Sequence, residues 1–212
     1  MYALTKMPPT SSPQNNAPEA PSTGRPPQKS VSALFIKEVF KFFLLVLLVV
    51  VPIRLFVAQP FIVSGPSMEP TFSTRNYLIV DELSYHLRAP ARGEVVVLED
   101  PRNNTLFLIK RIIGLPGETI DIAEGKVKIT NTEHPEGMVL DEPYISAPGG
   151  SGEYKHVLLK DNQYFVMGDN RPYSLDSRAL GPVTENLIVG RALVRLLPIS
   201  AAAVLPGYYK EE

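Results

Sequence analysis

Hydrophobic residues form a single long run near the start of this chain. Every residue from Phe42 to Ile53 is apolar, and after Arg54 the run resumes as far as Ala58. As one helix this segment rises by about 25 Å, close to the ~30 Å hydrocarbon thickness of a bilayer. Insertion is favourable because the apolar residues outweigh one arginine near the helix end, where its side chain can reach the headgroups. The pattern predicts one transmembrane anchor helix over residues 34–59.

The residues before this run have no apolar period. Residues 1–33 are rich in Pro, Ser, Asn and Thr, and such a segment cannot bury enough apolar surface to offset its ordering entropy, so we expect a disordered tail. Basic residues, among them Lys37 and Lys41, precede the run. They predict a cytoplasmic N-terminus and an extracytoplasmic domain over residues 60–212. No A-x-A site follows the run, which argues against a cleaved secretory leader.

Beyond residue 60 the hydrophobic pattern changes to short runs separated by turn residues. Runs rich in Val, Ile, Leu, Phe and Tyr are typical of β-strands. They read NYLIVDEL, GEVVVLED, TLFLIKRIIGL, KVKIT, QYFVMGD and GRALVRLL. No long helical period appears there, so we expect a mainly β protein, with an antiparallel β-rich core preceded by one N-terminal transmembrane helix.

Composition and charge exclude several classes of function. The 21 basic and 22 acidic residues leave a net charge of -1, which argues against a nucleic-acid-binding protein. With no cysteine, a disulfide scaffold, a thiolate metal site and a cysteine nucleophile are excluded. The three histidines stand far apart and form no H-x-x-x-H pair, so no metal site is expected. The acidic pairs Asp81–Glu82 and Asp141–Glu142 are interpreted as solvated turn charges.

Lys110 lies in the middle of the predicted strand TLFLIKRIIGL. Alternation along a strand places it on one face with Leu108 and Ile112, whereas Ile109 and Arg111 point to the other face. A lysine desolvated by aliphatic neighbours has a lowered pKa, and its neutral amine can act as a general base. The competing interpretation is a lysine at the edge of a strand whose ammonium group reaches solvent.

Ser67 occupies a rigid stretch, FIVSGPSMEPTF, directly after the apolar run. Pro66 and Pro70 restrict the backbone around it, and Gly65 allows a substrate chain to approach closely. A serine hydroxyl is the usual partner of a lysine base, and the Ser67 N–H could face a developing oxyanion. Taken alone, the same residues are also those of an ordinary turn.

A third polar stretch, MGDNRPYSLDSR, has the residues of a turn. Asp176 and Arg178 could form an ion pair that holds this turn, and Ser174 could hydrogen-bond within a nearby site. A plain β-turn between strands is the alternative. No serine–histidine–acid triad is visible, because GPSME is not a G-x-S-x-G motif.

Taken together, the anchor and the motifs SGPSMEPT, NYLIVDEL, KRIIGLPGE and GDNRPYSLDSR, in this order, resemble the bacterial type I signal peptidases. These are membrane-anchored serine proteases that remove signal peptides from exported proteins, and the resemblance covers roughly residues 37–198. It implies that Ser67 is the nucleophile and Lys110 the general base, without a metal or organic cofactor. It also implies that Ser174 orients the lysine amine and that Asp176 and Arg178 form a supporting ion pair.

The resemblance further implies a variable second β region, inserted in the catalytic domain at about residues 116–165, and a small apolar pocket for alanine-like residues. The positions that match substrate-binding residues are Phe61, Val63, Gly65, Met68, Phe72, Leu108 and Ile109. Two positions depart from the family pattern. A serine that helps form the oxyanion hole in some members is Gly65 here, with Ser64 one position further back, and Phe72 stands where leucine is usual.

The expected partners are preproteins that carry signal peptides and the lipid bilayer of the cell membrane, with no nucleic acid. Two alternatives stay open. A self-cleaving Ser–Lys regulatory protease would need an internal cut site and usually a DNA-binding domain. A non-catalytic, membrane-tethered β domain that binds exported chains would tolerate the loss of Ser67 and Lys110.

Overall fold

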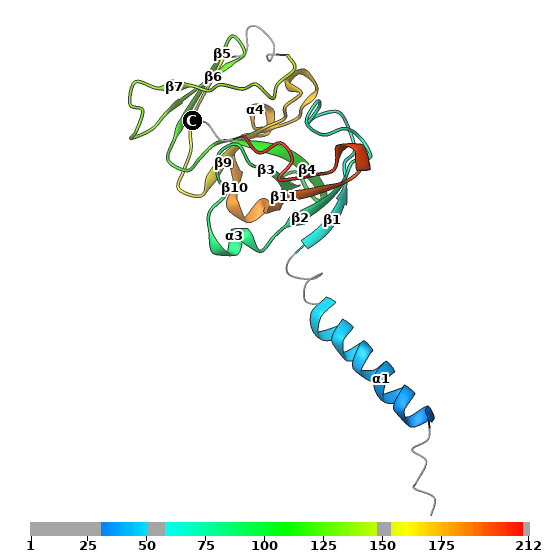
Figure 1. The fold of residues 1–212 in the computed structure, drawn as a ribbon. Coiled ribbons are helices and arrows are strands. Elements are labelled where there is room, and N and C mark those ends of the chain that lie inside the picture. Colours follow the sequence, from blue (N-terminus) through cyan, green and yellow to red (C-terminus); the bar gives the residue numbers. More distant parts are fainter. Residues whose placement is uncertain (1–30, 51–57, 148–153, 210–212) are drawn as a thin grey trace, which may run out of the picture. The chain divides into compact units, whose positions relative to one another are not determined.

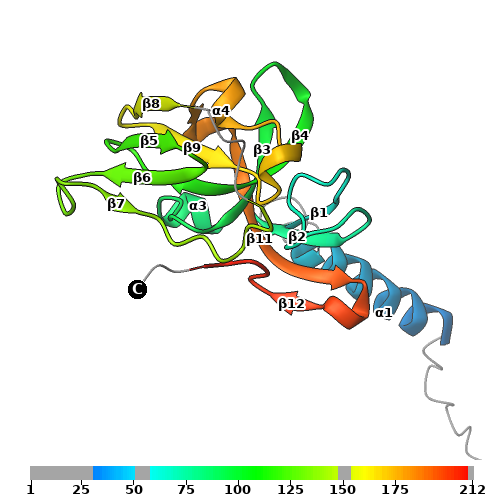
Figure 2. The ribbon, with the colours of Figure 1, turned by 90° about the horizontal axis from the view of Figure 1, so that it is seen from above.

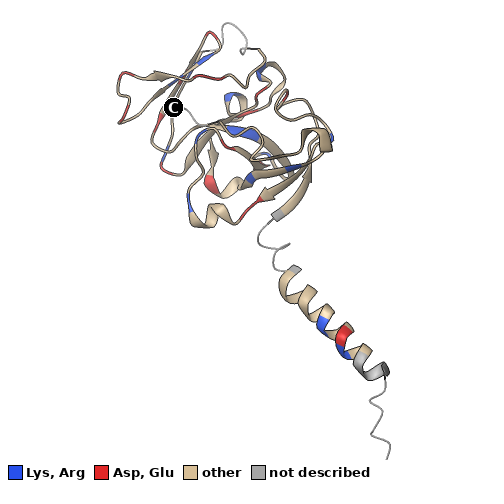
Figure 3. Cartoon of the chain, in the orientation of Figure 1, with Lys and Arg blue, Asp and Glu red and all other residues tan. Residues whose placement is uncertain are grey.

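The computed structural model describes residues 31–50, 58–147 and 154–209. Its first element is the helix α1 (Val31–Leu45), which continues as a π-helical turn over Val46–Val50. The charged residues of α1 all lie at or before Lys41, and the residues after it are apolar (Figure 3). Among the described residues, no helix is both long and apolar enough to cross a membrane. Most of the predicted tail and part of the predicted anchor lie outside the described residues.

The rest of the described chain is mainly β and forms two antiparallel sheets (Figures 1 and 2). The larger sheet has the strand order β1-β2-β11-β3-β4-β9-β10, with β12 paired to β11, and the smaller has the order β7-β6-β5-β8. The strands are β1 (Ala58–Ile62), β2 (Tyr77–Asp81), β3 (Val95–Asp100), β4 (Asn103–Gly114), β5 (Thr119–Ala123), β6 (Lys126–Thr130), β7 (Met138–Val139), β8 (Lys155–Leu158), β9 (Gln163–Met167), β10 (Val183–Thr184), β11 (Ile188–Leu197) and β12 (Ala203–Val204).

The six apolar runs chosen from the sequence are all strands, namely β2, β3, β4, β6, β9 and β11. The helices after residue 60 are short, with α3 (Ser84–Leu87) and α4 (Ser177–Leu180) spanning four residues each. The end predicted for the anchor helix, residue 59, is corrected. Ala58 and Gln59 belong to β1, because their backbones pair with Asp81 and Val80 of β2.

The smaller sheet lies between β4 and β9 in sequence, within the predicted inserted region. In β6 the lysines are exposed while Val127 and Ile129 are fully buried, which is the alternation of a sheet with one wet face. The buried side chains pack against Phe165 and Met167 of β9, so they join the two sheets. Each such aliphatic side chain contributes about 1.5–3 kcal/mol by leaving water. The β5–β6 hairpin turns through two residues with positive φ, Glu124 and Gly125.

Strand β3 lies in the middle of the larger sheet and has no wet face over Val95–Leu98, where every side chain is buried. Val95 belongs to one apolar cluster, and Val96 and Leu98 belong to another. One holds Met68 and Phe72 from the loop after β1, and the other holds Ile112 of β4 and Tyr164 of β9. Strand β4 pairs with β3 along much of its length, so Lys110 is held on a rigid element beside that loop.

The acidic pairs interpreted as solvated turn charges are partly buried, so that interpretation is wrong for two carboxylates. The Asp81 carboxylate pairs with Arg191 at 3.0 Å, with 10% of its side chain exposed. Glu142 forms an ion pair with Arg171 while exposing 6% of its side chain. Both carboxylates can be buried because each finds a guanidinium group from a distant part of the chain.

Candidate active site

Lys110 and Ser67 meet through their side chains. Lys110 Nζ lies 2.9 Å from Ser67 Oγ and also donates to the carbonyl oxygen of Ile109 at 2.9 Å. Ser67 comes from the loop after β1, and Lys110 comes from β4. Only 3% of Lys110 is exposed, so the alternative of a lysine that reaches solvent is wrong. The structure therefore brings together the two residues proposed as nucleophile and base.

Burial changes the acidity of Lys110. Desolvation lowers the pKa of its ammonium group from 10.5 to about 8, and the negative charges of Asp176, Asp169 and Asp100 partly oppose the fall. With a pKa of about 8, the amine is neutral in roughly a tenth of the molecules at pH 7 and in about half of them at pH 8. The amine can then accept the proton of Ser67 Oγ instead of donating to it.

The backbone around Ser67 is held from two sides. Gly65 has a backbone φ of +96°, which residues other than glycine rarely adopt. Its N–H donates to Thr74 Oγ1 at 3.2 Å. From the other side, the Asn170 N–H donates to the Ser67 carbonyl at 3.1 Å, and Asn170 Nδ2 donates to the Pro66 carbonyl at 3.0 Å. The turn after β9, which contains Gly168, Asp169 and Asn170, thus fixes the backbone of the nucleophile. The sequence did not indicate this role for Asn170.

The polar turn after β9 contains the ion pair expected from the sequence. Arg178 Nε and Nη2 each lie 2.9 Å from a carboxylate oxygen of Asp176, which also accepts the Gly168 N–H at 3.0 Å. Burial alone would raise the Asp176 pKa, but these bonds, the Arg178 charge and the nearby Ser174 hydroxyl hold it below its usual value. The carboxylate stays charged and holds the turn next to the dyad.

Ser174 lies near the nucleophile, and its hydroxyl makes no hydrogen bond to the lysine. A Cβ added to Gly168 would come within 2.2 Å of Ser174 Oγ and 2.4 Å of the Ser67 carbonyl oxygen. Ser174 Oγ is buried and makes no hydrogen bond of normal geometry among the described residues, although it lies near enough to the Asp176 carboxylate to help lower its pKa. The structure places Ser174 beside the dyad, with its hydroxyl not engaged with Lys110 Nζ.

An apolar hollow of about 140 Å³ opens beside the dyad. Of the predicted substrate-binding residues, Phe61, Val63, Leu108 and Ile109 line it, whereas Met68 and Phe72 are fully buried in the cluster that also holds Leu78, and Gly65 is not part of the lining. Sequence reasoning missed further lining residues, which are Ile62, Ser64, Leu78, Val97 and Phe107. A larger cavity of about 370 Å³ contains neither Ser67 nor Lys110. The smaller hollow is the candidate substrate site because both reacting side chains line it.

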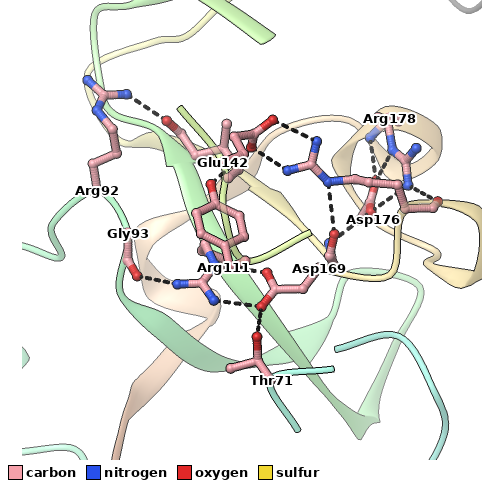
Figure 4. Close-up of polar contacts among 12 residues, drawn as sticks. Thr71, Arg92, Gly93, Arg111, Glu142, Asp169, Asp176 and Arg178 are labelled. Carbon is pink, nitrogen blue, oxygen red and sulfur yellow. Dashed lines mark hydrogen bonds and ion pairs between the residues drawn. The ribbon is translucent and has the colours of Figure 1, made fainter. Parts of the chain in front are cut away.

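Figure 4 shows a buried ion pair, between Arg111 and Asp169, that the sequence analysis did not foresee. Arg111, the residue after Lys110, is fully buried and binds Asp169 through Nε at 2.8 Å and Nη2 at 2.6 Å. Thr71 Oγ1 donates to the same carboxylate at 2.5 Å. Alternation already placed Arg111 on an apolar face of β4. A charged side chain on an apolar face requires a buried partner of opposite charge, so the sequence pattern could have predicted a buried acidic partner for Arg111.

The chain is similar to known signal peptidases over most of its length. A family model described as "Signal peptidase, peptidase S26" matches residues 36–197. The probable signal peptidase I-2 of Synechocystis sp. is 39% identical over 79% of this chain and 76% of that protein. Signal peptidase I of Leptolyngbya laminosa is 36% identical, covering 74% of this chain and 78% of that protein. Signal peptidase I S of Bacillus subtilis is 34% identical, covering 70% and 82%.

Proposed function

Since this chain belongs to the signal peptidase I family, peptidase S26, we propose that Ser67 and Lys110 are the dyad by which it cuts signal peptides from preproteins. The chain is a serine peptidase of that family. The observation that carries the assignment of residues is the 2.9 Å contact between Lys110 Nζ and Ser67 Oγ at the edge of a small apolar hollow.

In the proposed reaction, neutral Lys110 accepts the Ser67 proton while Ser67 Oγ attacks the carbonyl carbon before the cleavage site. The Ser67 N–H stabilises the oxyanion of the tetrahedral intermediate. The protonated amine then delivers its proton to the leaving nitrogen as the peptide bond breaks, which leaves an acyl-enzyme. Lys110 next accepts a proton from water, the hydroxide attacks the ester carbonyl, and that proton returns to Ser67 Oγ as the acid product leaves.

The hollow supports a preference for small residues before the cut. Its volume of about 140 Å³ equals the liquid volume of roughly five water molecules. Phe61 and Phe107, whose rings meet edge to face with centroids 5.3 Å apart, form part of its wall. A pocket narrowed by such bulky side chains admits alanine and rejects larger residues by steric clash.

The family is typically membrane-anchored, and we propose the same for this chain, with the anchor within residues 34–57, the N-terminus cytoplasmic and the catalytic domain outside. An anchored enzyme meets a substrate that is itself held in the bilayer by its apolar segment. Confinement of both partners to one surface raises their effective concentration and reduces the binding energy that the hollow must supply.

The test is cleavage of a purified preprotein with an A-x-A site, in detergent, by the intact chain and by Ser67→Ala and Lys110→Ala. Ser73→Ala and Lys126→Ala are matched controls, because both residues are exposed and lie outside the dyad. The proposal expects cleavage by the intact chain and both controls, with a loss of at least about 10³-fold in both dyad variants. Full activity in either dyad variant would contradict the assignment. No cleavage by any form would favour the non-catalytic tethered domain.

A further inference from the structure

The last described residues of the chain, 205–209, pack against Arg111 and Thr71, which are neighbours of the candidate active site; we call them the C-terminal strap. The Leu205 N–H donates to the Leu193 carbonyl of β11 at 2.7 Å, and Pro206 is buried, so the strap is attached to the larger sheet. From Gly207 onward the strap contacts β4, the loop after β1, the inserted region and the turn before β3. The strap is far from Ser67 and Lys110 in sequence. It contacts Arg111, the residue after Lys110, and the loop that carries Ser67.

Its first contact is with Arg111. The guanidinium group is fully buried, and besides Asp169 it donates from Nη1 to two carbonyl oxygens, Gly93 O at 2.9 Å and Gly207 O. The strap therefore supplies one of the acceptors that satisfy a buried cation. Loss of that acceptor would leave a buried N–H of a charged group without a partner, which is costly. Arg111 follows Lys110 directly on β4, so its orientation is coupled to the backbone that carries the base.

The second contact is with the loop that carries the nucleophile. Gly207 has φ +76°, and a Cβ added to it would lie 2.4 Å from Thr71 Cγ2. Thr71 is tied to the Asp169 carboxylate through Oγ1, and its carbonyl accepts from Arg195 Nη1 at 2.7 Å. The bond from the Phe72 N–H to the Met68 carbonyl, 2.8 Å, makes this part of the loop one stiff turn. A displacement of Thr71 would therefore move the turn that contains Met68, the residue next to Ser67.

The third contact ties the strap to residues from the inserted region. Tyr209 Oη donates to Asp141 at 3.0 Å, and its ring meets the Tyr144 ring edge to face with centroids 5.6 Å apart. The Arg111 guanidinium lies over that same Tyr144 ring, 3.9 Å from its centroid. A Cβ on Gly93 would lie 1.8 Å from the Tyr209 carbonyl oxygen, so the backbone of the strap is in direct contact with the turn that precedes β3.

We propose that the C-terminal strap positions the Ser67–Lys110 dyad by holding Arg111 and Thr71 against Asp169. The inference rests on the proposed dyad and adds Gly207 as a positioning residue. Gly207 is not a catalytic residue, because it touches neither the substrate nor the reacting atoms. Its effect is on the rate of the chemical step, since a displacement of about 1 Å in the reacting groups costs on the order of 10²-fold in rate. The substrate hollow does not include any strap residue, so substrate binding is expected to be unaffected.

The decisive variant is Gly207→Ala, compared with Gly117→Ala. Both glycines have positive φ, +76° and +80°, so both substitutions strain the backbone in the same way. A Cβ at Gly207 meets Thr71, whereas a Cβ at Gly117 has nothing within 4 Å. A second pair of variants ends the full chain after Pro206 or after Tyr209, so that the first lacks Gly207 and the second keeps the whole strap. For all four and the intact chain we would measure kcat and KM on the preprotein, and the thermal unfolding midpoint.

The proposal expects Gly207→Ala and the chain ending at Pro206 to lose on the order of tenfold or more in kcat, with KM within about twofold. It expects Gly117→Ala and the chain ending at Tyr209 to keep the intact kcat. Folded Gly207→Ala with unchanged kcat would overturn it. So would failure of both strap variants to fold while both controls fold, because the strap would then be only structural. These outcomes are separate from a failure of the dyad, which Ser67→Ala and Lys110→Ala report.

Discussion

The backbone N–H of Asn170 donates to the carbonyl oxygen of Ser67 at 3.1 Å, so the turn that follows β9 holds the nucleophile by its own peptide unit. Asp169, the residue before Asn170, pairs with Arg111, which follows Lys110. One turn therefore fixes the backbones of both reacting residues. Such rigidity is what a serine needs if its hydroxyl is to stay within hydrogen-bond reach of a buried amine.

The pH dependence of cleavage should follow the ionisation of Lys110. Only the neutral amine can accept the Ser67 proton, and the pKa is about 8. We expect kcat/KM to rise about tenfold per pH unit below the pKa and to level off above it. A pH–rate profile from pH 5 to 10 with a short peptide substrate measures this. A profile flat from pH 6 to 9 would count against a lysine base.

Replacing the buried lysine should separate activity from stability. In the folded chain the Lys110 pKa is lowered from 10.5 to about 8, so between these values the unfolded state binds more protons and the unfolding free energy rises with pH. Lys110→Met lacks this rise. We expect an inactive variant that is more stable than the intact chain at pH 7, by on the order of 3 kcal/mol, with the difference shrinking toward pH 10.

Urea unfolding at pH 7 and pH 10 gives the comparison, with the exposed Lys126→Met as control. For Lys126→Met, the difference in unfolding free energy from the intact chain should be the same at pH 7 and pH 10. A Lys110→Met variant less stable than the intact chain at pH 7 would mean that the ammonium group is well solvated in the fold.

The Asp176 carboxylate should affect both stability and the pH profile. Asp176→Asn removes the carboxylate charge that the Arg178 guanidinium group binds through Nε and Nη2, in a pair whose side chains are 0% and 9% exposed, and the loss of these charge-assisted hydrogen bonds should cost roughly 1.5–3 kcal/mol. Because the Asp176 charge raises the Lys110 pKa, its removal should also move the rise of kcat/KM to lower pH. Thermal unfolding and a pH–rate profile test both effects. Asp161→Asn, at an exposed position, should change neither, and a shift to higher pH would refute the electrostatic account.

The size of a side chain that lines the hollow should control which substrate residue is accepted before the cut. Val97 lines the hollow and is buried. Val97→Ala enlarges it by two methyl groups, so substrates with valine in place of alanine before the cut should gain about tenfold in relative kcat/KM. Val127→Ala removes the same two methyl groups from the smaller sheet. Both substitutions should lower the free energy of unfolding by roughly 1–2 kcal/mol, but Val127→Ala should leave the selectivity unchanged. Equal selectivity in the two variants would place the specificity pocket elsewhere.

Local pattern was enough for much of this protein. The six runs of β-branched and aromatic residues predicted six strands of the larger and smaller sheets, because alternation and turn residues act over a few positions. The same alternation indicated a desolvated Lys110, and the Gly–Pro stretch indicated a rigid serine. Short strands such as β7 and β12, two residues each, were missed because they have no periodicity of their own and exist only through their pairing.

The sequence by itself determined which residues could react: a serine in a constrained turn, a lysine among aliphatic neighbours, and an Asp–Arg pair two positions apart. Only the tertiary structure decided that Lys110 meets Ser67, 43 positions away, and that Arg111 is satisfied by Asp169, 58 positions away, and by Gly207, 96 positions away. The physical reason is that a buried charge must find its partner in space. Partners are set by sheet packing and chain topology, whereas periodicity reports only which face a side chain occupies.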